Sequence, residues 1–261
     1  MLSWGRPRNQ SSSFSKNRVD KGTSRTKRSF RDASTASKRV ENTSNSTRPQ
    51  QPQQPQPSLT SAIITLCVGR EQRLFAAHED VLCQASPFFQ SLCRGQFFES
   101  TQKRIDLPDE EPEIFSSVLE YLYKGDYFPR LVHDRRRQGW SLEDTIGSGY
   151  EPTIYHAATG TYLLKDTVIY CTAERYGMEE LKRLALRKQG LHSGIQCSTI
   201  LASARYAYAN TPDNDSKLRA HYLALIIRSR HTFKRSGTMQ NEMEAGGKLF
   251  FDLFVAMVNH M

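Results

Sequence analysis

The chain has 261 residues, a formal net charge of +9 and five cysteines. This length allows one or two domains. The longest apolar run, Leu249–Val258, is broken by Asp252 and covers about half of the ~20 residues that a membrane helix needs. No basic-then-apolar signal peptide opens the chain, and the cysteine count is odd. We therefore expect no membrane partner, no disulfide framework and a reducing compartment.

The excess charge lies in residues 1–58, which hold 12 Lys and Arg against three acidic residues, for a charge of +9. The remainder is neutral. Large apolar side chains are rare in this segment, which ends in the Pro/Gln run Pro49–Pro57. A chain of this kind cannot bury enough apolar surface to offset the entropy of ordering. We predict a disordered basic tail with an extended spacer, and nucleic-acid binding only non-specifically through that tail.

Three interpretations of the tail remain open. The pairs Lys27-Arg28 and Lys38-Arg39 are similar to a two-part nuclear import signal. The first 19 residues contain Arg and Ser but no acid, which also fits an organelle transit peptide. A solvated linker is the third interpretation. The expected localisation is nuclear, cytoplasmic or both.

The amino-acid composition changes at Leu59, where apolar and β-branched residues become frequent. Residues 62–68 and 73–77 predict a hairpin with a turn between them. Ser86 and Pro87 are typical of a helix N-cap and first helical position. The other elements predicted before residue 126 are a short helical turn over 78–85, a strand over 103–107, and a helix that Asp109 caps and Gly125 ends.

Residues 129–160 lose periodicity and are predicted to be an inserted loop. Its three arginines, 135–137, are expected to be solvated. Helical patterns follow, starting at Tyr162 and covering Met178–Lys188, Cys197–Ala209, Asp215–Arg230 and Gly247–Asn259. In the second of these, Leu181, Leu184 and Ala185 are expected to face inward, and Lys182, Arg183, Arg187 and Lys188 outward.

Catalytic and metal-binding motifs are missing from the sequence. The cysteines have no partners at zinc-site spacing, and Cys67, Cys83, Cys93 and Cys171 lie in apolar segments, where we expect them to be buried. Gly147-Ser148-Gly149 lacks the lysine and flanking elements of a phosphate-binding loop. We therefore expect a protein that is not an enzyme and needs no cofactor.

The order of local motifs resembles the BTB/POZ domain. The matching segments are Ile64–Gly69, Phe75–His78, Val81–Phe89, Gly95–Ser100, Arg104–Leu107, Glu111–Phe115, Tyr121–Gly125 and Tyr170–Met178. The insert and the Asn210–Arg219 stretch are similar to fungal members. The resemblance implies an α+β fold, a small mixed sheet flanked by a helical cluster. The predicted division is a tail over 1–58, the domain over 59–190 and a helical extension over 191–261.

Proteins of this family bind other proteins. Cullin-binding members carry an apolar residue, any residue and then Glu, a pattern that Phe97, Phe98 and Glu99 match. The resemblance therefore implies an adaptor that brings an unknown substrate to a cullin scaffold of a ubiquitin ligase. The alternative is a self-associating scaffold or transcription-associated protein without a cullin partner.

Two charges that line a pocket in corepressor-binding members are absent. Thr60 and Ser61 stand where the family has an acid, and Glu79 stands where it often has Lys. Corepressor binding is therefore not expected. The polar tail also lacks the apolar helix and strand of domain-swapped dimers, so a swapped dimer is not expected either.

Overall fold

The computed structural model describes residues 61–95, 103–135, 138–145 and 149–259. The predicted tail lies outside these residues. The first strands, β1 (Ile63–Val68) and β2 (Arg73–His78), form the predicted antiparallel hairpin. Gly69 sits in the turn at φ +77°, a backbone conformation that favours glycine.

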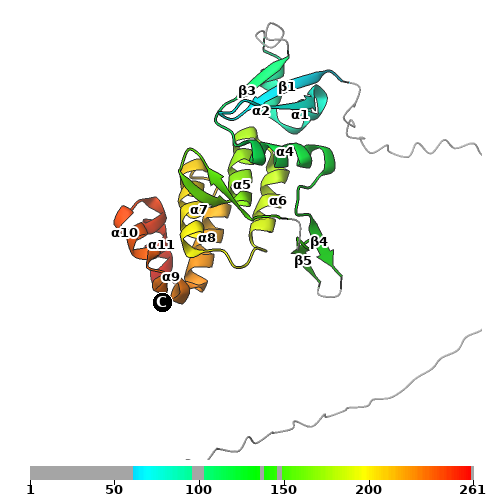
Figure 1. The fold of residues 1–261 in the computed structure, drawn as a ribbon. Helices are drawn as coiled ribbons and strands as arrows, with labels where there is room; N and C mark the ends of the chain where they lie inside the picture. Colours follow the sequence, from blue (N-terminus) through cyan, green and yellow to red (C-terminus); the bar gives the residue numbers. More distant parts are fainter. Residues whose placement is uncertain (1–60, 96–102, 136–137, 146–148, 260–261) are drawn as a thin grey trace, which may run out of the picture. The chain divides into compact units, whose positions relative to one another are not determined.

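The third strand, β3 (Arg104–Leu107), pairs with β1 in parallel, so the strand order is β2-β1-β3. Parallel neighbours need a crossover connection. Here the crossover carries two short helices, α1 (Glu79–Ala85) and α2 (Pro87–Cys93) (Figure 1). Both short helices and the strand were predicted.

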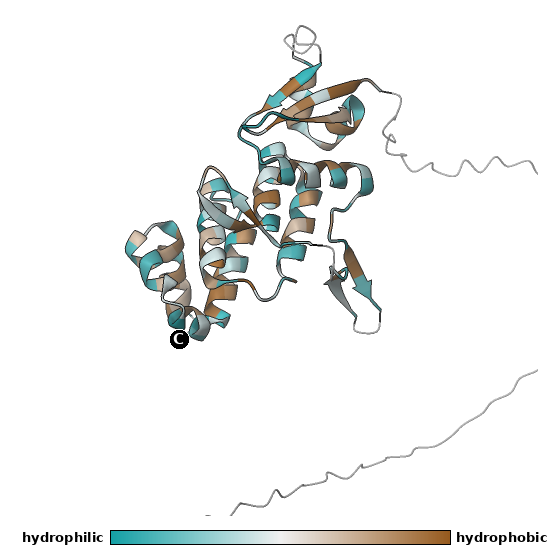
Figure 2. Cartoon of the chain, viewed as in Figure 1, coloured by the Kyte–Doolittle hydropathy of each residue, from teal (hydrophilic) through white to brown (hydrophobic). Residues whose placement is uncertain are grey.

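The inner face of β1 begins the core. Ile64, Leu66 and Val68 are fully buried, and β1 is largely brown in the hydropathy colouring of Figure 2. They join a cluster with Ile114 and Phe115 of α4 (Pro112–Lys124). Gly125 ends α4 at φ +73°, as its sequence predicts.

Seven further helices lie in the described residues after α4. They are α5 (Lys165–Tyr176), α6 (Glu179–Gln189), α7 (Cys197–Asn210), α8 (Lys217–Arg228), α9 (Arg230–Arg235), α10 (Thr238–Ala245) and α11 (Lys248–Asn259). α5 and α6 lie between α4 and the α7–α8 pair, and α10 and α11 lie beyond α7 and α8 (Figure 1). The predicted α+β class with a helical C-terminal region is confirmed.

One buried cluster runs through most of these elements. It includes Ile64 of β1, Ile169 of α5, Tyr222 of α8 and Leu249 of α11. Some polar groups inside it are paired: the Thr167 hydroxyl donates to the Gln189 side-chain oxygen at 2.7 Å and also hydrogen-bonds the Tyr222 hydroxyl. The domain boundary after residue 190 stays a prediction, because the packing is continuous across it.

The prediction of an irregular loop over 129–160 is wrong. Two antiparallel hairpins occupy most of this segment, β4 (Leu131–Asp134) with β5 (Gly139–Leu142) and β6 (Thr153–His156) with β7 (Thr161–Leu164). Each strand has four residues, too few for a clear alternation of polar and apolar positions. Cross-strand aromatic pairs hold them instead, with Tyr155 facing Tyr162 at 5.5 Å between ring centroids.

Three predicted helix limits also change. Tyr162 lies in β7, so the helix there starts at Lys165 instead. Asp109 does not cap α4, which begins after Glu111 with Pro112 at its first position. Between Asp109 and Glu111, Glu110 is buried and its carboxylate pairs with Arg175. The predicted helix 215–230 is shorter, and α9 and α10 follow it.

Candidate protein-binding surface

The cullin-type motif, Phe97, Phe98 and Glu99, lies outside the described residues. Its neighbours on both sides are described, since the chain is defined up to Gly95 after α2 and again from Lys103 before β3. The geometry of α2 and β3 therefore fixes where the motif leaves and rejoins the fold. The import-signal candidates Lys27, Arg28, Lys38 and Arg39 also lie outside the described residues.

Helix α2 is held firmly against α5. The Ser86 hydroxyl oxygen accepts from the Phe89 backbone N–H at 3.3 Å, as an N-cap does, and the same hydroxyl donates to the Tyr176 carbonyl at 2.7 Å. The rings of Phe89 and Tyr176 lie 4.9 Å apart. Gly177, at φ +70°, packs so closely on Pro87 that a Cβ would lie 2.8 Å from the proline ring. The first turn of α2, the helix that precedes the motif, is thus anchored to the core.

The β3 side is anchored through backbone and charge. The Thr65 N–H donates to the Lys103 carbonyl at 3.0 Å, and the Lys103 ammonium lies 3.8 Å from the Glu79 carboxylate. Glu79 is the residue that replaces the lysine often seen in the family. It has an ion-pair partner next to the motif, a role that the sequence alone did not indicate.

Two cysteines lie in the crossover helices, Cys83 in α1 and Cys93 at the end of α2. Both are half-buried, so the prediction that both are buried is wrong, whereas Cys67 and Cys171 are buried as expected. Burial raises the pKa of both Cys83 and Cys93, that of Cys93 to about 12. Both thiols therefore stay protonated at neutral pH and are poor nucleophiles.

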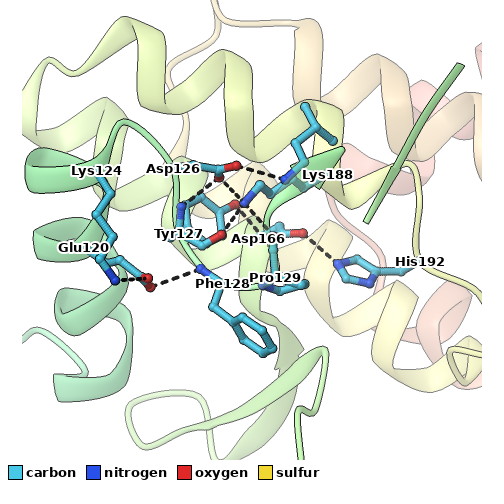
Figure 3. Close-up of polar contacts among 10 residues, drawn as sticks. Glu120, Lys124, Asp126, Tyr127, Phe128, Pro129, Asp166, Lys188 and His192 are labelled. Atoms are coloured by element: carbon cyan, nitrogen blue, oxygen red, sulfur yellow. Dashed lines mark hydrogen bonds and ion pairs between the residues drawn. The ribbon is translucent and has the colours of Figure 1, made fainter. Parts of the chain in front are cut away.

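A buried polar cluster joins α4, α5 and α6 (Figure 3). Lys188, predicted to face outward, is fully buried, and that prediction is wrong. Its ammonium donates to the Pro129 carbonyl at 2.8 Å, to the Tyr127 carbonyl and to the Asp126 carboxylate. Burial lowers the pKa of Lys188, and Asp126 partly opposes that effect. All three donors of the ammonium have partners.

Asp166 extends this cluster. One carboxylate oxygen accepts from the Tyr127 hydroxyl at 2.6 Å, and the other lies 2.7 Å from Nε2 of His192. Burial raises the pKa of Tyr127, and the neighbouring Asp166 charge adds to that effect. These groups bind one another and hold the chain where it leaves α4 for the β4–β5 hairpin. The cluster is therefore a support for the fold.

Lys182, the second lysine wrongly predicted to face outward, is also buried. Its ammonium lies 2.9 Å from the Asp215 carboxylate and 3.2 Å from Glu179, and it pairs with Glu174 as well. Lys182 directly follows the buried Leu181 in α6. Lysine is rarely buried in proteins, so the sequence alone does not indicate that this one is. Carboxylates at Glu174 and Asp215 supply the compensation that burial of a charge requires.

Exposed apolar side chains occur on the outer face of the sheet. Ile63 on β1 and Leu74 on β2 are 61% and 65% exposed and point to the same side, with Thr65 and Ala76 paired between them. A two-strand surface of this kind fits contact with another protein. None of the described helices is both long and apolar enough to cross a membrane.

Comparison with known families agrees with this arrangement of hairpin, crossover helices, parallel strand and following helix. Residues 61–134 match the model of the BTB/POZ domain. The chain carries a BTB/POZ domain. Its α2 and β3, which flank the cullin-type motif, both lie inside the matched range. BTB/POZ domains are protein-interaction modules, and in this chain further helices follow the matched range.

Curated relatives match over a similar length. Human Kelch-like protein 11 is 41% identical over 69 residues, human Kelch-like protein 30 is 33% identical over 64 residues, and zebrafish (Danio rerio) Kelch-like protein 38 is 34% identical over 62 residues. Each match covers 24% of this chain and 10–11% of the relative. The chain thus spans about a tenth of the length of these relatives, and the similarity concerns the BTB/POZ region.

Proposed function

We propose that the protein is an adaptor that binds a cullin scaffold through its BTB/POZ domain and holds a second protein with its other surfaces. The observation that carries the proposal is the combination of a matched BTB/POZ domain with the Phe97-Phe98-Glu99 sequence between α2 and β3. An exposed aromatic ring can fill an apolar pocket on a partner, and an adjacent carboxylate can fix its orientation.

The anchoring of α2 and β3 supports the proposal. A binding segment whose two ends are held by the core loses less conformational entropy on binding than one on a free chain. The bond from Ser86 to Tyr176 holds the start of α2, the helix before this segment, and the Thr65–Lys103 backbone bond holds the residue at which the described chain resumes. The Kelch-like relatives support a protein-interaction role for the same region.

The test is co-purification of the tagged full chain with endogenous cullins, detected with cullin antibodies. We expect wild type to retain a cullin and Phe97→Ala/Glu99→Ala to lose about 90% of it, the loss that a tenfold higher Kd gives when the cullin concentration is well below Kd. The matched control is Phe251→Ala/Glu151→Ala, which removes an exposed phenylalanine and an exposed carboxylate elsewhere. Absence of cullin from the wild-type preparation would refute the proposal.

Self-association is the second candidate function, and the exposed pair Ile63 and Leu74 on the sheet favours it. Sedimentation of the full chain over a range of concentrations tests it. Ile63→Ser/Leu74→Ser should shift the distribution toward monomer if the sheet face mediates the contact. A wild-type chain that stays monomeric at high concentration would speak against a scaffold.

Nuclear import through Lys27-Arg28 and Lys38-Arg39 is part of the same proposal for the basic tail. A fluorescent fusion of the full chain should accumulate in the nucleus, and alanine at the four positions should make it cytoplasmic. If the wild-type fusion and the four-alanine variant distribute equally between nucleus and cytoplasm, these four residues do not direct import.

A further inference from the structure

An apolar groove lies among the last four helices. Its volume is about 560 Å³, within the range of ligand-binding clefts in proteins. The apolar lining comes from α8, α10 and α11 and includes three methionines, which adapt their shape easily. The lining residues are Ile226, Met239, Met243, Phe250, Leu253, Phe254 and Met257.

Helix α11 is apolar on more than one face. Of its residues only Leu249 and Leu253 are buried, whereas Phe251 is 68% and Phe254 63% exposed. A helix that is hydrophobic all around is normally covered by other protein. The residues that line the groove, Phe250, Leu253, Phe254 and Met257, are spaced i, i+3, i+4 and i+7 and so form one stripe.

The rim of the groove is basic. Arg230, His231 and Lys234 line it, and no acidic residue does. Within the described part of the chain, neither Arg230 nor Lys234 forms an ion pair with a carboxylate, whereas other cations of this region are paired, Arg205 with Glu242 and Lys248 with Asp213. The groove therefore presents positive charge beside an apolar floor.

We propose that this groove binds an acidic amphipathic helix of a partner protein. The stripe from Phe250 to Met257 spans about 10 Å, since each helical residue adds 1.5 Å. A bound helix would therefore present about two turns, with apolar anchors at i, i+3 or i+4 and i+7. Carboxylates flanking those anchors would meet Arg230 and Lys234. The idea that the bound helix belongs to a substrate rests on the adaptor function proposed above. The binding of an acidic helix in the groove does not depend on that function.

The positive charge of the groove disfavours two other occupants, the N-terminal tail of this chain and a second copy of it. The tail of this chain carries +9 over its 58 residues, so the basic rim would repel it. A second copy could offer its own α11, but the acid of that helix, Asp252, accepts a hydrogen bond from Tyr208 at 3.0 Å.

The test uses the full chain and a fluorescent helical peptide of about 18 residues, with Leu at i, i+3 and i+7 and Glu on the flanks. Fluorescence anisotropy should show saturable binding below about 100 µM. A peptide of the same composition in scrambled order, and one with Lys in place of Glu, serve as controls. Both should bind at least about tenfold more weakly.

Variants locate the binding. Phe254→Ser and Lys234→Glu should each weaken the Leu/Glu peptide about tenfold or more, whereas Phe251→Ser, which changes an exposed ring outside the groove, should not. Circular dichroism checks that each variant is folded. Phe251, Phe254 and Lys234 are all exposed, so we expect the fold to tolerate these substitutions. Cullin co-purification of the same variants should be unchanged, so a failure here is distinguishable from failure of the adaptor proposal.

Four results would overturn the proposal. These are no saturable binding of the Leu/Glu peptide, equal binding of the scrambled peptide, equal loss in Phe251→Ser and Phe254→Ser, and insensitivity to Lys234→Glu. Concentration-dependent dimers that Phe254→Ser abolishes would assign the face to a second copy instead. Tight binding to phosphatidylserine vesicles without binding to the peptide would assign it to a membrane.

Discussion

The ammonium group of Lys182 lies 2.9 Å from the carboxylate of Asp215 and joins α6 to the turn that precedes α8. Asp215 also accepts from the Tyr170 hydroxyl of α5 at 2.8 Å. One buried cation thus connects three parts of the helical region. Burial alone would lower the pKa of Lys182, but its hydrogen bonds to Glu174, Asp215 and Glu179 raise it.

Loss of this cation should destabilise the protein strongly. Lys182→Met leaves the carboxylates of Asp215 and Glu174 without their partner, and removing one member of a buried ion pair costs about 3–5 kcal/mol. Urea unfolding followed by circular dichroism measures the change. The control is Arg183→Met on the same helix, whose exposed pair with Glu180 should contribute less than about 1 kcal/mol. Equal midpoints for the two variants would contradict the interpretation.

The cluster around Lys188 should protect the segment after α4 from proteolysis. Lys188→Met removes donors to the Pro129 carbonyl and to Asp126, so the chain there should open more often. Trypsin should then cleave after Arg130 faster than in wild type, with a loss of unfolding free energy of about 3 kcal/mol. Mass spectrometry of early fragments identifies the site, and Arg183→Met again serves as control. Unchanged cleavage would show that the hairpin is held by other contacts.

His156 should make stability fall in mild acid. It is buried and faces Tyr206 of α7 at 4.9 Å between rings. Burial lowers the pKa of His156, although Glu111 and Glu110 oppose the shift. Because the folded pKa lies below the unfolded value near 6.5, the unfolded state takes up the proton first as pH falls. Stability is therefore full above about pH 6.5 and declines below it, by at most about 1.4 kcal/mol per pH unit.

Thermal unfolding between pH 8 and pH 5 measures this effect. Wild type should lose stability below pH 6.5 more steeply than His156→Gln, in which the titrating group is gone. Burial also lowers the pKa of His221, so the double variant His156→Gln/His221→Gln should show the flattest profile. Parallel curves for wild type and both variants would rule out these histidines as the cause.

Gly177 should tolerate alanine less well than Gly125. Both have positive φ, +70° and +73°, which costs an L-residue about 1–2 kcal/mol. At Gly125 a Cβ meets nothing within 4 Å, whereas at Gly177 it would lie 2.8 Å from Pro87. We expect Gly177→Ala to cost about 1–3 kcal/mol more than Gly125→Ala, because overpacking adds to the strain. Urea midpoints compare the two, and similar values would mean that α2 shifts without cost.

Clear local signals made several elements of the fold predictable from the sequence. The apolar run of β1, the Ser86-Pro87 start of α2 and the Gly125 end of α4 are local signals, and the structure confirms each of them. The four-residue strands β4–β7 carry too little pattern to be recognised. Their cross-strand aromatic contacts, such as His133 with Trp140, are visible only once the strands are paired.

The candidate site was predictable in part. The sequence placed Phe97–Glu99 between a helix and a strand, and those two elements are where it predicted them. Burial of Lys182 and Lys188 could not be predicted, because their partners Asp215 and Asp126 are 33 and 62 residues distant in sequence. The groove could not be predicted either, since its lining combines side chains from separate helices that only tertiary packing brings together.

Among the described residues, Ile200, Leu223 and Phe250 each pack against both buried clusters. Phe250 also lines the groove, so an occupant there would touch a side chain that supports the larger core. A partner that binds only the folded form stabilises it by about 2.7 kcal/mol at a concentration of 100 Kd. Because the two clusters share these residues, we expect a partner bound in the groove of α8–α11 to raise the unfolding temperature of the BTB/POZ region as well.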